Sequence, residues 1–188
     1  MALTRLGPNQ SINLATNTTG TLGVANGGTG LTSGTSGQFL KFTGSTTVAS
    51  AAAGKVLQVV TATTDSNTTT TSGSWATVSS FPEVSITPSS SSNKVYVHLS
   101  SSFETASGTT SYFTLYRNGT TNLGTSLDGL SKTQIGGQAL PGSMAILDSP
   151  SSTSAVTYKV YAYNSSAGNQ AYVGKGVKQT ITAFEIEG

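Results

Sequence analysis

The sequence predicts an all-β protein, and three features of its composition lead to that expectation. Serine and threonine, with 29 and 32 residues, make up roughly a third of the 188-residue chain. Charged residues are only 9% of it, whereas an ordinary soluble domain carries about 25%. Charged helix formers are therefore scarce, while β-branched residues, which favour strands, are abundant. Hydrophobic residues, at 35%, still suffice to build the core of one domain.

The same composition excludes several classes of function. Nine basic and seven acidic residues give a net charge of +2 without any basic run, too little for a nucleic-acid binder. With no cysteine, the chain has no disulfide framework, no thiolate zinc site and no cysteine nucleophile. No run of about 18 apolar residues occurs, so we expect no insertion into a membrane.

The first 54 residues differ in composition from the rest, and we expect two parts, 1–54 and 55–188. The N-terminal part contains no acidic residue, no Tyr and no Trp, and its only charged residues are Arg5 and Lys41. Its scattered apolar residues cannot bury enough surface to offset the entropy lost when a single chain becomes ordered. This part is either a disordered leader or an extended anchor and shaft that becomes ordered against sister chains or a docking partner.

From Lys55 onward, short apolar segments separated by turn residues predict an antiparallel β-sandwich or jelly roll. The apolar run Lys55–Ala62 predicts a buried strand, and the polar tract Thr63–Ser74 predicts a loop. Strict alternation predicts half-buried strands at 94–101 and 111–117. The following Asn118-Gly119 predicts a hairpin turn, because both residues can adopt positive φ. Further strands are expected at Trp75–Val78, Glu83–Thr87, Ala139–Leu147, Ala155–Asn164, Ala171–Val173 and Gln179–Glu187.

Two of the expected strands carry apolar side chains on both faces. An isolated sandwich buries one face of each strand, so this pattern predicts cover from the domain's own core and from a neighbouring subunit. A few exposed tyrosines are the plainer interpretation. The residues expected at the interface between subunits are Tyr161, Tyr163, Ile181, Phe184 and Ile186.

No arrangement of residues points to catalysis. His98, the only histidine, falls within an alternating strand and has no nucleophile-elbow motif to accompany it. The seven carboxylates are dispersed, so neither a glycosidase pair nor a calcium loop is predicted. Glu185 and Glu187 would instead limit edge pairing near the chain end. We expect a protein that is not an enzyme and binds neither a metal nor a cofactor.

A tract of the N-terminal part resembles the connecting regions of bacteriophage tail-fibre and related virion proteins. Residues 20–22 read GTL, residues 24–33 read VANGGTGLTS, and residues 37–40, GQFL, resemble the phrase that often follows. Thr18 and Gly23 stand where Val and Pro are common in such proteins. The residues expected to form the anchor and shaft are Leu14, Leu22, Val24, Asn26, Gly27, Gly28 and Gly30.

The C-terminal part resembles a domain found in virion proteins of marine phages. The similar phrases lie at residues 55–60, 86–90, 93–95, 147–150, 157–159 and 181–188. Such proteins resemble trimeric fibres with a jelly-roll head, similar in outline to complement- and tumour-necrosis-factor-like knobs.

These observations together predict a homotrimeric virion fibre, attached to the phage particle and to its other proteins through residues 1–54. Loops at the tip of the knob would contact a host-surface glycan or an outer-membrane receptor, because long polar loops adapt to ligands. The alternatives are a structural role in the same particle, as a head fibre, decoration protein or adaptor, and, third, a glycan depolymerase. The loops expected to make contact are Asp65–Ser74, Ser102–Thr110 and Ser165–Asn169, with Asn67, Ser107 and Asn169 as contact residues.

Overall fold

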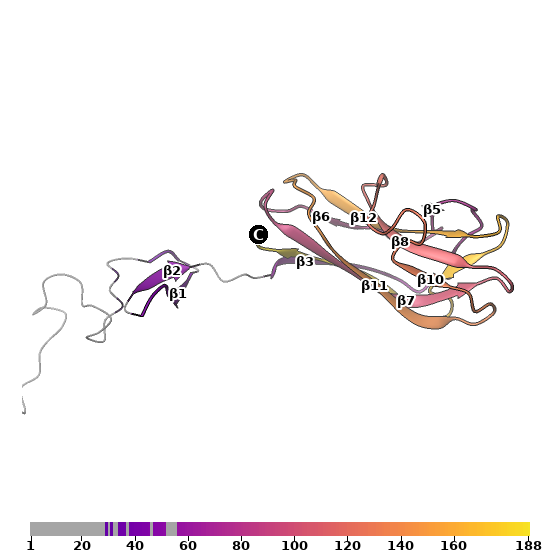
Figure 1. Ribbon diagram of the computed structural model, residues 1–188, viewed down its shortest axis with the longest axis horizontal. Coiled ribbons are helices and arrows are strands. Elements are labelled where there is room, and N and C mark those ends of the chain that lie inside the picture. Colours follow the sequence, from indigo (N-terminus) through magenta and orange to yellow (C-terminus); the bar gives the residue numbers. More distant parts are fainter. Residues whose placement is uncertain (1–28, 30, 32–33, 37, 46, 52–55) are drawn as a thin grey trace, which may run out of the picture. The chain divides into compact units, whose positions relative to one another are not determined.

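The computed structural model describes residues 29, 31, 34–36, 38–45, 47–51 and 56–188 of the chain (Figure 1). The chain divides into two units, Met1–Ala53 and Gly54–Gly188. All regular secondary structure in the described residues is β-strand, in agreement with the predicted all-β class. In the same described part of the chain, no helix is long and apolar enough to cross a membrane.

The described part of the first unit is a β-hairpin. Its strands, β1 (Phe39–Phe42) and β2 (Val48–Ala51), pair antiparallel, with Phe39 opposite Ala51 and Phe42 opposite Val48. β1 is exposed along its whole length: the exposed fractions of Phe39, Leu40 and Phe42 are 65%, 58% and 69%. A two-stranded hairpin is marginally stable by itself, so these side chains lack the apolar cover that such a hairpin needs.

The second unit consists of two six-stranded antiparallel sheets. In sheet I the order is β10-β8-β12-β5, with β6 beside β12 and β9 beside β8. In sheet II the order is β3-β14-β7-β13-β4, with β11 beside β7. The strands of sheet I are β5 (Ala76–Thr77), β6 (Val84–Ile86), β8 (Ser111–Arg117), β9 (Thr121–Asn122), β10 (Ser131–Thr133) and β12 (Val156–Asn164). Those of sheet II are β3 (Val56–Thr64), β4 (Thr68–Thr70), β7 (Lys94–Thr105), β11 (Leu140–Asp148), β13 (Ala171–Val173) and β14 (Gln179–Ile186).

The core lies between the two sheets and confirms the alternation that predicted its strands. Val97 and Leu99 of sheet II and Leu115 of sheet I are fully buried. The rings of Phe103 and Phe113 stack across the gap between the sheets, with their centroids 4.5 Å apart. The unit is therefore a β-sandwich whose two inner faces interdigitate.

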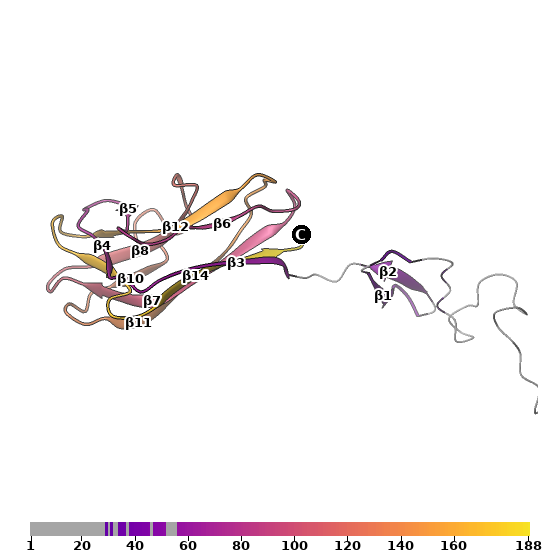
Figure 2. The same ribbon diagram turned by 180° about the vertical axis from the view of Figure 1, so that it is seen from behind.

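The sandwich has two distinct ends. At one end, β3 begins and β14 finishes (Figures 1 and 2), and Val56 pairs with Ile186 there. We call this the base end. At the opposite end, Thr64 pairs with Gln179 and Ser111 pairs with Asn164, and the loops that leave these residues gather there. We call this the loop end.

Several boundaries depart from the sequence-based expectation. The run Lys55–Ala62 was predicted to be a buried strand, but β3 lies at an edge of sheet II and its first residues are exposed. Strand β4 lies within the predicted loop Thr63–Ser74, and β7 continues to Thr105. Strands β9 and β10 were not predicted, because neither is long enough to show alternation. The hairpin turn after β8 is confirmed: Asn118 and Gly119 have φ of 50° and 70°.

Candidate functional site

The structure brings the three expected contact residues to the same end of the sandwich. Asn67 follows β3, Ser107 follows β7 and Asn169 follows β12, and all three strands finish at the loop end (Figure 2). Ser107 and Asn67 are exposed, and Asn169 is half-buried. Chain segments far apart in sequence therefore lie at the same end of the sandwich.

Hydrogen bonds join these loops to one another. The amide of Ser165 donates to the carbonyl oxygen of Thr110 at 2.8 Å, and the amide of Thr110 donates to the Ser165 hydroxyl at 3.0 Å. The amide of Gly168 donates to the carbonyl oxygen of Thr71 at 2.9 Å. The amide of Gly176 donates to Oδ1 of Asn67 at 2.9 Å. Because the backbone of the loops is fixed in this way, less entropy would be lost when a ligand binds to them.

A buried polar cluster beneath the loops supports them. The Asn164 side chain is fully buried, and its Nδ2 donates to the hydroxyl oxygens of Thr109 at 2.8 Å and of Thr105 and Ser111 at 3.1 Å. The Ser111 hydroxyl donates to Thr105 at 2.8 Å. Buried polar groups are stable when each finds a partner, and this cluster ties the ends of β7, β8 and β12 together. The sequence contains no signal for it, because serine and threonine occur everywhere in the chain.

Charge is sparse at the loop end, and most of it is neutralised. Lys175 Nζ lies 2.7 Å from Oε1 of Glu104, and it lies 4.7 Å from the centre of the Tyr172 ring. The hydrogen bond to Glu104 raises the pKa of Lys175. Lys178 and Asp65 are the other charged residues in these loops and have opposite signs. The surface offered to a ligand is therefore rich in hydroxyl and amide groups and nearly neutral.

Two of the predicted contact loops are shorter than expected. The range Asp65–Ser74 contains β4, whose Thr68 is fully buried and donates its hydroxyl to the carbonyl oxygen of Val173 at 2.6 Å. The range Ser102–Thr110 begins with the last residues of β7, which are buried. The segments free to contact a ligand are therefore 65–67, 71–74 and 106–110, together with 165–170.

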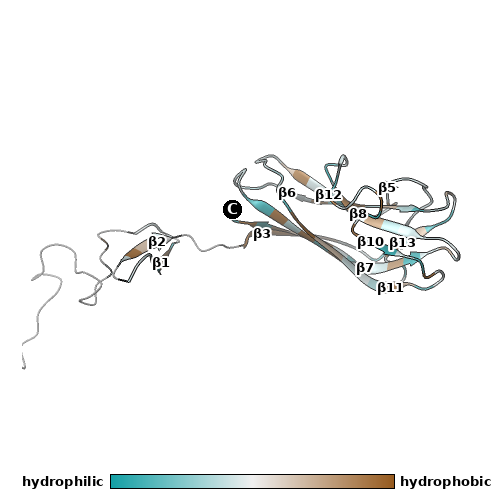
Figure 3. Cartoon of the chain, in the orientation of Figure 1, coloured by the Kyte–Doolittle hydropathy of each residue, from teal (hydrophilic) through white to brown (hydrophobic). Residues whose placement is uncertain are grey.

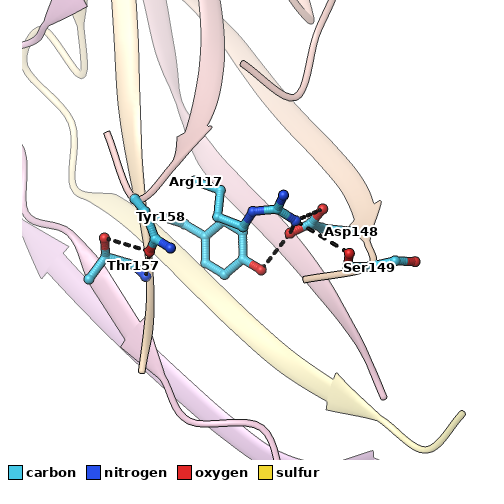
Figure 4. Close-up of polar contacts among 6 residues, drawn as sticks. Arg117, Asp148, Ser149, Thr157 and Tyr158 are labelled. Atoms are coloured by element: carbon cyan, nitrogen blue, oxygen red, sulfur yellow. Dashed lines mark hydrogen bonds and ion pairs between the residues drawn. The ribbon is translucent and has the colours of Figure 1, made fainter. Parts of the chain in front are cut away.

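The base end is closed by a polar clamp between the sheets, which the sequence did not predict (Figure 4). Nη1 of Arg117, at the end of β8, lies 2.8 and 2.9 Å from the two carboxylate oxygens of Asp148, at the end of β11. The buried Tyr158 hydroxyl donates to Oδ2 of the same carboxylate at 2.8 Å. Burial first, and then the hydrogen bond to Asp148, raise the pKa of Tyr158, so its hydroxyl remains a donor.

The residues expected at an interface between subunits divide among three places. Tyr161 and Tyr163 lie on the outer face of sheet I, Phe184 and Ile186 lie on the outer face of sheet II, and all four are half-buried. Ile181 is fully buried in the core, which corrects its expected place at a surface. The cause is the register of β14, in which Ile181 pairs with the buried Leu99 and shares its face.

Four tyrosines on the outer face of sheet I form two stacked pairs. The rings of Tyr112 and Tyr163 lie 4.5 Å apart, and those of Tyr116 and Tyr161 lie 4.0 Å apart. Burial and then the adjacent Tyr161 raise the pKa of Tyr116. Such pairs on neighbouring strands stabilise the sheet that carries them.

One of these pairs also holds the segment between β9 and β10. The Tyr163 hydroxyl donates to the carbonyl oxygen of Leu127 at 2.8 Å, and the indole nitrogen of Trp75 donates to that of Ser126 at 2.9 Å. Gly129 lies so close that a Cβ there would be 2.6 Å from the Trp75 ring. These aromatic groups therefore support a loop, a role that the sequence-based interpretation did not include.

Other candidate positions can be placed only in part. The expected anchor and shaft residues, Leu14, Leu22, Val24, Asn26, Gly27, Gly28 and Gly30, lie outside the described residues. His98 lies on the outer face of sheet II between Thr182 and Ala145. Glu185 was expected to protect an edge, but β14 lies between β3 and β7, and the Glu185 carboxylate is buried. In the part of the chain that the structure describes, no three His, Cys, Asp or Glu residues gather as metal ligands.

Comparison with known proteins identifies no family for this chain. No family model matches it, and no curated protein matches it. Among solved structures, the chain is similar to VP2 in the subviral particle of infectious bursal disease virus, with 14% sequence identity over 77% of this chain and a TM-score of 0.34. The chain spans 40% of the length of that structure. A superposition of this quality assigns neither topology nor function.

Proposed function

We propose that this chain is a phage virion fibre that attaches to host cells through the loop end of its sandwich. The observation that carries the proposal is the position of the loops 65–67, 106–110 and 165–170, which lie together at the end opposite the start of β3. A chain that reaches the sandwich through β3 presents these loops at the far end. The virion-type tract at residues 24–33 supports attachment of the N-terminal part to a particle.

The chemistry of the loop end favours a glycan as the receptor. Hydroxyl and amide groups dominate these loops, and they match the alternating donors and acceptors of a sugar. The single ion pair of Glu104 and Lys175 leaves no cluster of free positive charge in the described loops for a polyanion. Assembly as a homotrimer would multiply a modest affinity at each site by raising the effective concentration of the other two.

Binding of the purified full chain to immobilised surface polysaccharides of Gram-negative bacteria tests this proposal. We expect saturable binding to at least one of them without release of reducing sugar. Release of reducing sugar would support the depolymerase instead. If the chain binds neither any of the polysaccharides nor the parent cells, host attachment is contradicted.

A structural role in the particle is the second candidate, and the hairpin β1–β2 favours it. Phe39, Leu40 and Phe42 are exposed there, and a hairpin of this size needs an apolar partner. A head fibre, a decoration protein or an adaptor would use such a surface for docking. Immunolabelling of the chain over the capsid shell, combined with absence of cell binding, would establish this candidate over the first.

A further inference from the structure

We infer that the base end of the outer face of sheet II is the surface on which a second copy of this chain packs. This inference rests on the self-association included in the proposed function and is independent of receptor binding. The surface consists of six apolar residues, which we call the apolar band. They are Val56, Val59, Tyr96, Leu147, Phe184 and Ile186.

The apolar band crosses four strands of sheet II, β3, β14, β7 and β11. In the strand register, Phe184 of β14 lies between Val59 of β3 and Tyr96 of β7, and Tyr96 pairs in turn with Leu147 of β11. Ile186 and Val56 form a second pair at the base end. The exposed fractions of Val59, Leu147 and Val56 are 55%, 51% and 51%. In Figure 3 the start of β3 has a hydrophobic colour.

Toward the loop end the same face becomes mostly polar: the next row holds Thr61, Thr182, His98 and Ala145. In the row after that, the corresponding residues are Thr63, Thr180, Ser100 and Ser143, which all carry hydroxyl groups. Isolated exposed apolar residues are normal on a protein surface, but a continuous row across four strands marks a site of interaction. The apolar band is thus a local feature of the base end.

The edge of β3 adds to this surface. Its nine residues, Val56–Thr64, contain neither a charged residue nor proline, the two devices that commonly protect an exposed edge. The apolar run that predicted a buried strand is also typical of a strand covered on both faces. Within one subunit only Val60 and Ala62 pack against the core, so the outward face of the strand is left to a partner.

The composition of the surface favours a second copy as that partner. Four strands about 4.8 Å apart, over a stretch of about four residues at about 3.4 Å per residue, give the apolar band an area of roughly 260 Å². A specific interface buries about 800 Å² per partner, so the band would form the apolar centre of a larger contact that includes the edge of β3. Interfaces between identical subunits are the more apolar class and are enriched in aromatic residues, as here with Tyr96 and Phe184. Lys94, beside Ile186, is the charged residue in these rows and lies at their rim.

Lysine substitutions with matched controls test this inference on the full chain. Val59→Lys and Leu147→Lys place a charge in the apolar band, whereas Thr63→Lys and Ser143→Lys place it four residues away on the same strand and face. Light scattering should give a multiple of the 19.0 kDa chain mass for the natural sequence and both controls. It should give the mass of one chain for the two band variants. A single-chain mass for the natural sequence, or band variants that keep the oligomer mass, would overturn the inference.

A second measurement covers the case in which a lysine variant fails to fold. The chain has no cysteine, so a single introduced thiol reports on its own surroundings. Val59→Cys should be protected from a maleimide reagent in the assembled protein, and Thr63→Cys should react freely. Equal reaction of the two thiols would contradict packing on the apolar band. Neither measurement involves a receptor, so a chain that assembles through the band but binds no glycan would refute only host attachment.

Discussion

Replacing Asp148 with alanine should destabilise the sandwich strongly, because its carboxylate joins the two sheets at the base end. Asp148 is 8% exposed and accepts hydrogen bonds from Arg117 of β8 and Tyr158 of β12. The fully buried Tyr158 hydroxyl would lose its partner and could not reach water. Arg117, whose side chain is 23% exposed, would recover part of its hydration.

The expected cost follows from these two losses. An unsatisfied buried donor costs about 1–3 kcal/mol, and a hydrogen bond to a charged group contributes about 1.5–3 kcal/mol. Because Arg117 is partly exposed, its ion pair with Asp148 is intermediate between a surface pair and a buried pair. Its contribution should therefore lie near the lower end of the range for a hydrogen bond to a charged group. We therefore expect Asp148→Ala to lower the free energy of unfolding by about 3 kcal/mol. For a chain of this size, that corresponds to a fall in Tm of roughly 6–12 °C.

Urea denaturation of the full chain measures this change, and Asp128→Ala is the matched control. Asp128 forms an exposed ion pair with Lys132, four residues further along the chain, and this pair should contribute less than about 1 kcal/mol. In the double variant Asp148→Ala/Tyr158→Phe, the loss should be smaller than the sum of the single losses, because no buried hydroxyl is then left unpaired. Equal effects of the two alanine substitutions would refute the clamp.

Three further predictions concern other buried contacts. Burial would raise the pKa of Glu185, but hydrogen bonds from Asn93 and Ser89 outweigh burial and lower the pKa. The free energy of unfolding should therefore fall as the pH drops below about 4.3, where the unfolded chain takes up the proton more readily. Glu185→Gln should flatten this pH dependence in acid unfolding. Gly129→Ala should lower the free energy of unfolding by well over the roughly 1–2 kcal/mol of backbone strain at positive φ, and it should shift the fluorescence of Trp75. Gly137→Ala is the control: it also has positive φ but open space around it, so it should cost that strain alone. Asn164→Ala should cost about 2–3 kcal/mol and accelerate hydrogen exchange in the loop-end amides.

The sequence predicted those elements of the fold that depend on local pattern. Alternation identified β7 and β8, and the positive φ available to Asn118-Gly119 identified a turn. Strands β9 and β10 were missed, because two or three polar residues carry no period. The apolar run in β3 was correctly identified as a strand, but its edge position depends on the order of strands in the sheet, which no local pattern records.

The candidate site was predictable in outline. Polar sequence placed Asn67, Ser107 and Asn169 in loops, and the antiparallel topology then brought those loops to one end. The contacts that hold the base end of the sandwich were not predictable, since Arg117 meets Asp148 across 31 positions and Ser89 meets Glu185 across 96. Partners this far apart are selected by the fold as a whole.

Binding of the fluorescently labelled full chain to bacterial cells, measured by flow cytometry, tests host attachment through the loop end most directly. Ser107→Trp adds bulk at an exposed position of the loop end, and Thr120→Trp adds the same bulk at an exposed position of the base end. We expect the natural chain and Thr120→Trp to bind equally and Ser107→Trp to lose binding. Equal binding of all three proteins, or loss with Thr120→Trp alone, would refute host attachment through the loop end.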